Sequence, residues 1–249
     1  MVHFVGAGPG AADLITVRGK GLIESADIII YAGSLVNREL LEYAKQAREV
    51  YNSAHMTLEQ VMDIISSNSD KEIVRLHTGD PSIYGAIREQ MDMLDALGIE
   101  YDVCPGVSSM FGAAAALGAE YTLPGVSQSV IITRMAGRTP VPESESIESF
   151  AAHGASMVIF LSAGMLEELS GRLISGGCAP DLPAAIVYKA TWPDEKKIIT
   201  TVEGLAAAAK RNGINKTALV LVGDFLDSEY ERSKLYDPSF SHGCRRSTE

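Results

Sequence analysis

Short apolar segments alternate with amphipathic stretches along the first half of the chain. Apolar runs that fit strands cover residues 2–5, 28–31, 73–76 and 101–104. Stretches with helical periodicity cover residues 39–45, 58–66, 83–97 and 110–117. This alternation is typical of βαβ units and predicts a mainly parallel sheet.

A second series of elements follows the turn at Pro124 and Gly125. Its expected strands are residues 129–133, 157–161, 185–188, 198–201 and 218–222, and its expected helices are residues 147–152, 165–173 and 202–211. Because a Pro-Gly turn interrupts two otherwise regular patterns, we place a domain boundary there. The sequence thus predicts an α/β protein with an N-terminal α/β domain (1–123), a C-terminal α/β domain (124–237) and a disordered tail (238–249) without apolar periodicity.

The first candidate site is a glycine-rich turn that follows the first strand. Gly6, Gly8 and Gly10 lack a Cβ, so the backbone turns tightly there and a ligand approaches it closely. The spacing GxGxG differs from the dinucleotide fingerprint GxGxxG, and Pro9 removes an N–H that could have bound a phosphate. The second strand ends at Tyr31 without the acid that binds a ribose. A nicotinamide oxidoreductase is therefore disfavoured, and the motif alone leaves open a ligand site or a tight connection.

The second candidate site, VRLHTGDPSIYG, is a turn after the third strand. The strand is expected to end at Thr78, and Gly79 then allows the turn. The next helix is expected to begin near Ser82, with its free N–H groups at the carboxyl end of the sheet, where open α/β sheets bind ligands. Asp80 has two interpretations: it caps this helix, or its carboxylate binds a cationic sulfonium or ribose hydroxyls. The sequence leaves both open.

Two later motifs combine a strand end with small residues. CPGVSSMFGAAAALG (104–118) and SAGM (162–165) each lead from a strand into a helix and leave main-chain N–H and C=O groups accessible. Small residues also let helices pack closely, and Met165 on its own is expected to be a core residue. A further stretch, YKATWPDEK, is expected to form a strand and a loop.

The composition excludes several classes of protein. Hydrophobic residues make up 46% of the 249 residues, which is enough to fill the cores of two domains. No apolar run approaches the roughly 20 residues that span a bilayer. We therefore expect no membrane partner. The chain begins without a basic segment followed by an apolar one, so we expect no secretory signal, and we expect a cytoplasmic location.

Charge and cysteine spacing narrow the choice of ligands. The formal net charge of −11 disfavours a nucleic-acid partner, and it equally opposes a polycarboxylate ligand unless basic side chains gather locally. Cys104, Cys178 and Cys244 are widely spaced and form no CxxC pattern. Neither a metal site nor a disulfide framework is therefore expected.

In their order and spacing, these motifs resemble the tetrapyrrole methylase family over residues 2–223. The first signature of that family is similar to VGAGPGAADLITVRG, and the second is similar to VRLHTGDPSIYG followed by PGVSS. Within the family, the stretches YAGSLV, LHTGDPSIYGAIREQM, SQSVIITRMAGRTPVPE and YKATWPDEK are similar to the branch that methylates precorrin-4, or its cobalt complex, at C11. The resemblance therefore implies C-methylation of a small-molecule tetrapyrrole in cobalamin biosynthesis, with S-adenosyl-L-methionine as donor and S-adenosyl-L-homocysteine as product.

The resemblance also implies the fold of the family, which is two α/β domains with a cofactor and substrate cleft between them, and a homodimer. It places the glycine-rich loop beside the donor and the substrate, which agrees with the presence of Pro9. It implies no covalent nucleophile, and no catalytic residue is assigned. The donor-binding residues that it implies are Pro9, Thr78, Gly79, Asp80, Ile83, Tyr84, Ser108, Ser109, Met165, Ala190, Thr217 and Ala218.

The implied substrate carries several acetate and propionate carboxylates. Basic side chains that flank the motifs are Arg18, Lys20, Arg38, Arg88, Arg134, Arg138 and Lys189. Arginine is suited to carboxylates because its planar fork pairs with both oxygens. The predicted substrate-binding residues are Arg38, Arg134, Arg138 and Lys189, and we expect most from Arg134 and Arg38, which follow strand or turn segments.

Several alternatives stay open at this point. The main one is methylation of another tetrapyrrole, at the uroporphyrinogen III, precorrin-2 or precorrin-3 stage, by a sibling of the same family. Branches that modify ribosomal RNA or a diphthamide precursor are disfavoured because the chain has no basic run. A binding protein without activity is disfavoured because none of the motifs is degraded. A comparison of the binding of labelled S-adenosylmethionine with the binding of NADH distinguishes a methyltransferase from a nicotinamide oxidoreductase.

Overall fold

The computed structural model describes residues 1–227 and 229–247, which form two compact units. Unit 1 consists of Met1–Ala113 together with Lys189–Glu195, and unit 2 contains the rest. The division lies inside helix α4 (Ser109–Leu117), upstream of the Pro-Gly turn at which the sequence predicted it. The place of Lys189–Glu195 in unit 1 has no counterpart in the sequence prediction.

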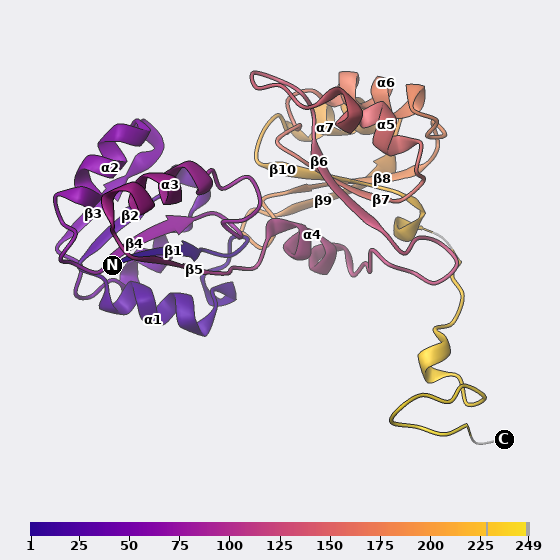
Figure 1. Cartoon of the computed structure of the whole chain (residues 1–249). Coiled ribbons are helices and arrows are strands. Elements are labelled where there is room, and N and C mark those ends of the chain that lie inside the picture. The colour runs from indigo at the N-terminus through magenta and orange to yellow at the C-terminus, as the bar shows by residue number, and fades with distance from the viewer. Residues whose placement is uncertain (228, 248–249) are drawn as a thin grey trace. The chain divides into compact units, whose positions relative to one another are not determined.

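Unit 1 contains a five-stranded parallel sheet in the order β3-β2-β4-β1-β5 (Figure 1). Its strands are β1 (Val2–Gly6), β2 (Ile28–Tyr31), β3 (Glu49–Asn52), β4 (Ile73–His77) and β5 (Tyr101–Cys104). Val5 pairs with Leu76 on one side and with Cys104 on the other, so the carboxyl ends of β4, β1 and β5 lie level. In this sheet the connection after β1 runs toward β2, and the connection after β4 runs in the opposite direction, toward β5. Open α/β sheets bind ligands at the carboxyl ends of two strands whose connections diverge in this way.

Helices cover both faces of this sheet (Figure 1). They are α1 (Val17–Ser25), α2 (Leu58–Ser66) and α3 (Arg88–Leu97). Alternate residues of β1 enter different cores, because side chains on a strand alternate between faces. Val5 packs with Ile23 of α1, whereas Phe4 shares a core with Leu94 of α3 and with residues of α2.

Unit 2 contains a mixed five-stranded sheet in the order β6-β7-β10-β8-β9. Its strands are β6 (Val130–Arg134), β7 (Ser156–Phe160), β8 (Pro183–Tyr188), β9 (Lys196–Thr201) and β10 (Ala218–Val222). β6 and β7 are parallel, and the other three pairings are antiparallel. The carboxyl ends of β6, β7 and β8 therefore lie at the same edge as the amino ends of β9 and β10.

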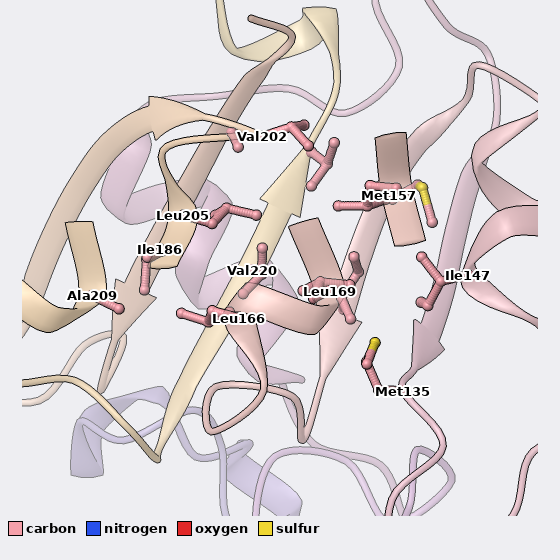
Figure 2. Close-up of a cluster of buried hydrophobic side chains, with 14 of the residues drawn as sticks. Met135, Ile147, Met157, Leu166, Leu169, Ile186, Val202, Leu205, Ala209 and Val220 are labelled. Carbon is pink, nitrogen blue, oxygen red and sulfur yellow. The ribbon is translucent and has the colours of Figure 1, made fainter. Parts of the chain in front are cut away.

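Three helices pack on one face of the second sheet (Figure 1), and their buried side chains close its core (Figure 2). They are α5 (Ile147–Ala151), α6 (Leu166–Ser175) and α7 (Leu205–Asn212). Leu166 and Leu169 are three residues apart on α6 and so lie on one side of it, where they meet Ile186 of β8 and Val220 of β10.

Among the described residues, one strand and one α-helix were not predicted from the sequence. β3 lies at the edge of the sheet and leaves Val50 47% exposed, so it lacks the apolar run that marks the buried strands. α1 buries only Gly19 and Ile23, and it begins at the N-cap Thr16, whose hydroxyl accepts from the Gly19 N–H. The stretch predicted as a helix over residues 39–45 forms a 3₁₀ helix, Arg38–Tyr43.

The described part of the tail, residues 238–247, contains neither helix nor strand. It holds one isolated bridge, between His242 and Arg245. Residues 248–249 lie outside the described residues, and the disorder expected of the tail stays a prediction. Within residues 1–227 and 229–247, no helix has the length and apolar character needed to cross a membrane.

Candidate functional site

The glycine-rich loop after β1 contacts the loop after β4 through main-chain groups. The Gly8 N–H donates to the Gly79 carbonyl at 3.3 Å, and the Gly79 N–H donates to the Gly8 carbonyl at 2.9 Å. The Ala7 N–H donates to the carbonyl of His77 at 2.7 Å. Gly8 and Gly79 have φ values of +80° and +63°, which glycine adopts at little cost. Two separate motifs of the sequence therefore form one surface at the carboxyl ends of β1 and β4.

Three glycines meet at the ends of β1, β4 and β5. A Cβ at Gly106 would lie 2.2 Å from the Gly79 carbonyl oxygen and 2.7 Å from the Gly6 Cα. A Cβ at Gly79 itself would lie 3.5 Å from the Ser108 Cα, which is an ordinary contact, so φ is the obstacle there. Only glycine allows the three strand ends to approach this closely.

Asp80 links the loop after β4 to the loop after β5. Its Oδ2 accepts from the Gly106 N–H at 2.8 Å, and its Oδ1 accepts from the Ser82 N–H at 2.9 Å and from the Ser82 hydroxyl. Burial raises the pKa of the Asp80 carboxyl, but the hydrogen bonds from Ser82 and Gly106 outweigh burial and hold that pKa below its usual value. The interpretation of Asp80 as a cap of the next helix is wrong, because α3 begins at Arg88 and not near Ser82. Its contact with a donor stays a prediction.

The segment before α3 is a strained turn. Tyr84 and Ala86 have φ values of +56° and +50°, which are unfavourable for residues with a Cβ. Gly85 lies between them, and a Cβ there would lie 2.1 Å from the Pro81 carbonyl oxygen. The first five residues of the predicted helix, Ile83 included, therefore belong to this turn. Strain of this kind concentrates at ligand-binding loops.

The other predicted donor-binding residues of unit 1 lie at the same edge of the sheet. Thr78 and Gly79 follow β4, while Ser108 precedes α4 and Ser109 begins it. The main chain of Ser108 and Ser109 lies directly beside Gly79. Ser108 is buried, whereas Tyr84 is 46% exposed.

Lys189–Glu195 connects β8 to β9 and packs in unit 1 against the glycine-rich loop. The Trp192 Nε1–H donates to the Pro9 carbonyl at 3.2 Å. The Ala11 N–H donates to the Thr191 hydroxyl at 3.0 Å. The loop that contains Pro9 is therefore held by a segment from far along the chain.

Gly10 lies against this segment. A Cβ at Gly10 would lie 2.2 Å from Cδ1 of Trp192 and 2.9 Å from the carbonyl oxygen of Ala190. On another side, the Asn37 Nδ2–H donates to the Gly10 carbonyl at 2.9 Å. Of the predicted donor-binding residues, Pro9 and Ala190 are thus both beside Gly10.

In unit 2, Ser162 organises the loop after β7. Its buried hydroxyl donates to the Phe160 carbonyl at 2.7 Å and accepts from the Met135 N–H at 2.9 Å. Its carbonyl accepts from the Met165 N–H at 2.9 Å, just before α6 begins. One side chain therefore connects the loop after β6 to the loop that carries Met165.

The remaining predicted donor-binding residues lie close to this loop. A Cβ at Gly164 would lie 3.3 Å from the Asn215 carbonyl oxygen, so the segment before α6 is beside the segment before β10. That segment ends in Thr217, with φ +55°, and Ala218 begins β10. Met165 packs against the core of unit 2 but is only half-buried. It is therefore a core residue on one side, and the rest of its side chain is accessible.

Arg134 holds its own loop. Its Nη1 donates to the carbonyls of Met135 at 3.1 Å and Thr139 at 3.2 Å, and its Nη2 donates to the carbonyl of Pro140 at 2.8 Å. Arg138 lies in the same loop and is exposed. Any carboxylate that binds Arg134 would share the guanidinium with these carbonyls.

The other two predicted substrate-binding residues are in unit 1. Arg38 is exposed at the start of its 3₁₀ helix. Lys189 is half-buried, with Nζ 2.7 Å from Asp194 Oδ2 and 5.5 Å from the centroid of the Trp192 ring. Its charge is therefore balanced locally, which leaves Arg38 and Arg138 as the two exposed members of the predicted set.

Sequence reasoning missed two basic side chains buried in β4. Arg75 donates through Nε to Gln90 Oε1 at 3.1 Å and through Nη1 to the Ile30 carbonyl at 3.2 Å. His77 is 4% exposed, and its Nε2 has no hydrogen-bond partner in the described part of the chain. Burial and the Arg75 charge lower the pKa of His77 to about 3, so it is neutral at pH 7. The signal in the sequence was the pattern Arg-Leu-His inside an otherwise apolar strand.

Comparison with known proteins gives concordant results. The family model described as Tetrapyrrole (Corrin/Porphyrin) Methylases matches residues 1–206. The chain is 53% identical to the cobalt-precorrin-4 C(11)-methyltransferase of Methanocaldococcus jannaschii, over 99% of this chain and 96% of that protein. It is 42% identical to the precorrin-4 C(11)-methyltransferase of Pseudomonas aeruginosa, over 97% of each. The solved structure of a cobalt precorrin-4 methyltransferase matches with a TM-score of 0.88 and 45% identity, over 91% of this chain and 96% of that one.

Proposed function

Because the chain belongs to the tetrapyrrole (corrin/porphyrin) methylase family, we propose that it methylates precorrin-4, or its cobalt complex, at C11 with S-adenosylmethionine as donor. The observation that carries this proposal is the identity of 53% over nearly the whole chain to an enzyme of that name. Cobalt-precorrin-4 is the first substrate to test, since the relative with 53% identity is named for the cobalt form and the relative with 42% for the metal-free one.

The carboxyl edge of the unit 1 sheet fits the donor on two observations. Gly6, Gly79 and Gly106 carry no side chains, so main-chain groups of three strand ends are accessible at one place. Asp80 is a carboxylate at neutral pH, which suits the cationic sulfonium or the ribose hydroxyls of the donor. We assign the donor contacts of this unit as Pro9, Thr78, Gly79, Asp80, Ile83, Tyr84, Ser108, Ser109 and Ala190.

For unit 2 we assign Met165, Thr217 and Ala218 as donor contacts. All three lie at the edge where the carboxyl end of β7 and the amino end of β10 meet. The half-buried surfaces of Met165 and Thr217 support the assignment, because they leave part of each residue available to a ligand.

The donor supplies a methyl group on sulfonium sulfur, and a nucleophilic carbon of the tetrapyrrole takes it. A carbon–carbon bond forms as the carbon–sulfur bond breaks, and the electron pair of the broken bond stays on sulfur. No covalent protein nucleophile is required, so the protein contributes mainly by alignment of the two reactants, which supplies on the order of 7 to 11 kcal/mol. The side chains that hold substrate carboxylates are, in this proposal, Arg38, Arg134, Arg138 and Lys189.

The decisive experiment uses methyl-labelled donor with cobalt-precorrin-4 and, separately, with precorrin-4. NMR of the product is expected to place one label at C11. A label at another ring position would instead support the sibling activity on a different tetrapyrrole stage. It would leave the family assignment intact.

The donor site is tested with glycine variants matched in backbone conformation. Gly79→Val is expected to weaken S-adenosylhomocysteine binding roughly tenfold or more in calorimetry, because a β-branched residue at φ +63° displaces the loop. Gly98→Val is the control: Gly98 has φ +67° at the end of α3, and nothing lies within 4 Å of its added Cβ. If Gly79→Val fails to fold, Gly79→Ala replaces it. Equal affinity in the folded Gly79 and Gly98 variants would move the donor elsewhere.

We further propose that the protein is a cytoplasmic homodimer, as is common in the family. Light scattering coupled to gel filtration is expected to give twice the chain mass of 26.6 kDa. A mass of one chain at micromolar concentration would overturn this part of the proposal without touching the reaction.

A further inference from the structure

Lys189–Glu195 is a braced turn, not a loose connection. The Trp192 N–H donates to the Lys189 carbonyl at 3.0 Å, and the Glu195 N–H donates to the Trp192 carbonyl at 3.0 Å. The Thr191 N–H donates to Glu195 Oε2 at 2.6 Å. Lys189 and Thr191 have φ values of +46° and +70°, an unfavourable conformation that persists only where surrounding contacts impose it.

This turn fixes the glycine-rich loop on both sides of Gly10. The Pro9 carbonyl accepts from the Trp192 indole, and the Ala11 N–H donates to the Thr191 hydroxyl. The Gly10 carbonyl between them accepts from Asn37. Each of three successive residues of the loop is therefore held by a side chain from outside it.

Gly10 and Gly112 make this close packing possible because they carry no Cβ. An added Cβ at Gly10 would lie 2.4 Å from Trp192 Nε1, and one at Gly112 would lie 2.9 Å from Cβ of Pro9. Pro9 is thus confined between the helix that carries Gly112 and the indole of Trp192. Its carbonyl orientation depends on the indole N–H, the one polar atom of that side chain.

We propose that Trp192 is a positioning residue, whose indole N–H fixes the Pro9 carbonyl and with it the part of the glycine-rich loop that aligns donor and tetrapyrrole. This inference rests on the proposed function, because it takes Pro9 to lie beside both reactants. Trp192 acts through Pro9 and is not itself assigned a contact with either ligand.

The test replaces Trp192 by phenylalanine, which keeps an aromatic ring and removes the N–H. The matched control is Tyr101→Phe, which removes a hydrogen bond of 3.3 Å to Asp95 at the amino end of β5, away from the site. Turnover of cobalt-precorrin-4 is measured per donor-binding site, counted by calorimetric titration with S-adenosylhomocysteine. This normalisation removes any loss of folded protein, which a merely structural role would cause.

Trp192→Phe is expected to lower kcat per site about fivefold, the order of one lost hydrogen bond, with the Kd for S-adenosylhomocysteine changed by less than about twofold. Tyr101→Phe is expected to match the wild type in both. Unchanged kcat per site in Trp192→Phe would overturn the inference, and so would a loss of donor affinity with kcat unchanged, because Trp192 would then serve binding and not alignment. If Trp192→Phe does not fold, Thr191→Ala removes the neighbouring contact to Ala11 and is judged by the same criteria.

Trp192 is also the one tryptophan of the chain, so its fluorescence reports on this turn alone. Titration of the wild type with S-adenosylhomocysteine is expected to shift or quench its emission, with the Kd found by calorimetry. Emission that stays constant at saturating donor would count against a Trp192–Pro9 contact beside the donor. Absence of methyl transfer by the wild type would instead refute the proposed function, and the inference would fall with it, whereas equal turnover by the wild type and Trp192→Phe refutes the inference alone.

Discussion

In unit 1 the ends of β1, β4 and β5 approach so closely that a Cβ on Gly106 would lie 2.2 Å from the Gly79 carbonyl oxygen, whereas in unit 2 the side chains of Ser162 and Arg134 hold the loops after β7 and β6. β6 and β7 are parallel, so the loops after them also lie at one edge of their sheet. There, however, the loops are joined by the Ser162 hydroxyl and not by a close approach of glycine main chains. The meeting point of β1, β4 and β5 is therefore sensitive to added atoms, and the loops after β6 and β7 are sensitive to removed ones.

The buried polar side chains differ in the same way. Among the described residues, those of unit 2 are hydroxyls only, namely Thr133, Ser156, Ser162 and Ser170. Those of unit 1 include the titratable groups His3, Arg75 and His77. Changes of pH within the range of histidine are therefore expected to act first on unit 1.

The largest expected effect is that of an added methyl group in unit 1. Gly106→Ala is expected to reduce the free energy of unfolding by about 3 kcal/mol or more, since the clash is with main-chain atoms that have no rotamer to change. Gly137→Ala in unit 2 is the control, because its Cβ would meet only the flexible Met165 side chain, 3.6 Å from the methyl carbon and 3.8 Å from Sδ, and should change stability by less than about 0.5 kcal/mol. Urea denaturation measures both. Equal losses in the two variants would remove the contrast between the units.

The second prediction concerns the removal of a buried hydroxyl group from unit 2. Ser162→Ala leaves the Met135 N–H without its acceptor inside the protein and is expected to cost about 2 kcal/mol. Ser170→Ala, which removes another buried hydroxyl on α6, should cost almost nothing because alanine is the better helix former. A Ser162→Ala variant as stable as Ser170→Ala would show that the loop after β6 does not depend on that hydroxyl.

Alanine variants of Arg38 and Arg134 distinguish an effect on substrate binding from an effect on the stability of a loop. Arg38→Ala and Arg134→Ala are each expected to raise the KM for the tetrapyrrole roughly tenfold, for a lost charge-assisted contact of about 1.5 kcal/mol, with donor affinity unchanged. Only Arg134→Ala should also destabilise unit 2, because its guanidinium holds three carbonyls of its own loop. Steady-state kinetics and thermal melts give the two readouts. Unaltered tetrapyrrole kinetics in both variants would mean that other groups hold the carboxylates.

The smallest expected effect is on pH dependence in unit 1. The pKa of His77 is about 3 in the folded protein and about 6.5 in the unfolded chain, so the unfolded chain binds the extra proton as the pH falls below 6.5. His77 therefore makes the protein less stable by about 1.4 kcal/mol at pH 5.5 than at pH 7.5. In His77→Gln, which does not titrate, the loss between these two pH values should be smaller by that amount. Urea denaturation at both pH values checks it, and identical losses in the two proteins would contradict the buried neutral imidazole.

Much of the fold was predictable because its signal is local. The buried strand β2 is a continuous apolar run, as is typical of parallel strands covered on both faces, and the amphipathic stretch over residues 58–66 forms α2 at those bounds. β3 and the strained turn before α3 were not predictable in this way. The polar edge position of β3 and the left-handed Tyr84 and Ala86 follow from neighbours that are distant in the sequence.

The residues of the candidate site also differ in whether the local sequence indicates them. Gly79 and Asp80 stood out because they directly follow a buried strand and belong to a stretch that resembles the second signature of the family. Trp192 was not indicated, because the sequence around a tryptophan in a loop does not show which distant carbonyl its indole binds. The turn that connects β8 to β9 packs in unit 1, and no pattern along the chain encodes that placement.

The meeting of Gly6, Gly79 and Gly106 has a consequence for engineering. Binding sites are commonly transplanted by copying a few side chains onto a new scaffold, but these three positions offer none to copy. What would have to be transferred is the path of three loops and the spacing of the strands that carry them. The proposed donor site is therefore expected to move between proteins only as a whole sheet edge.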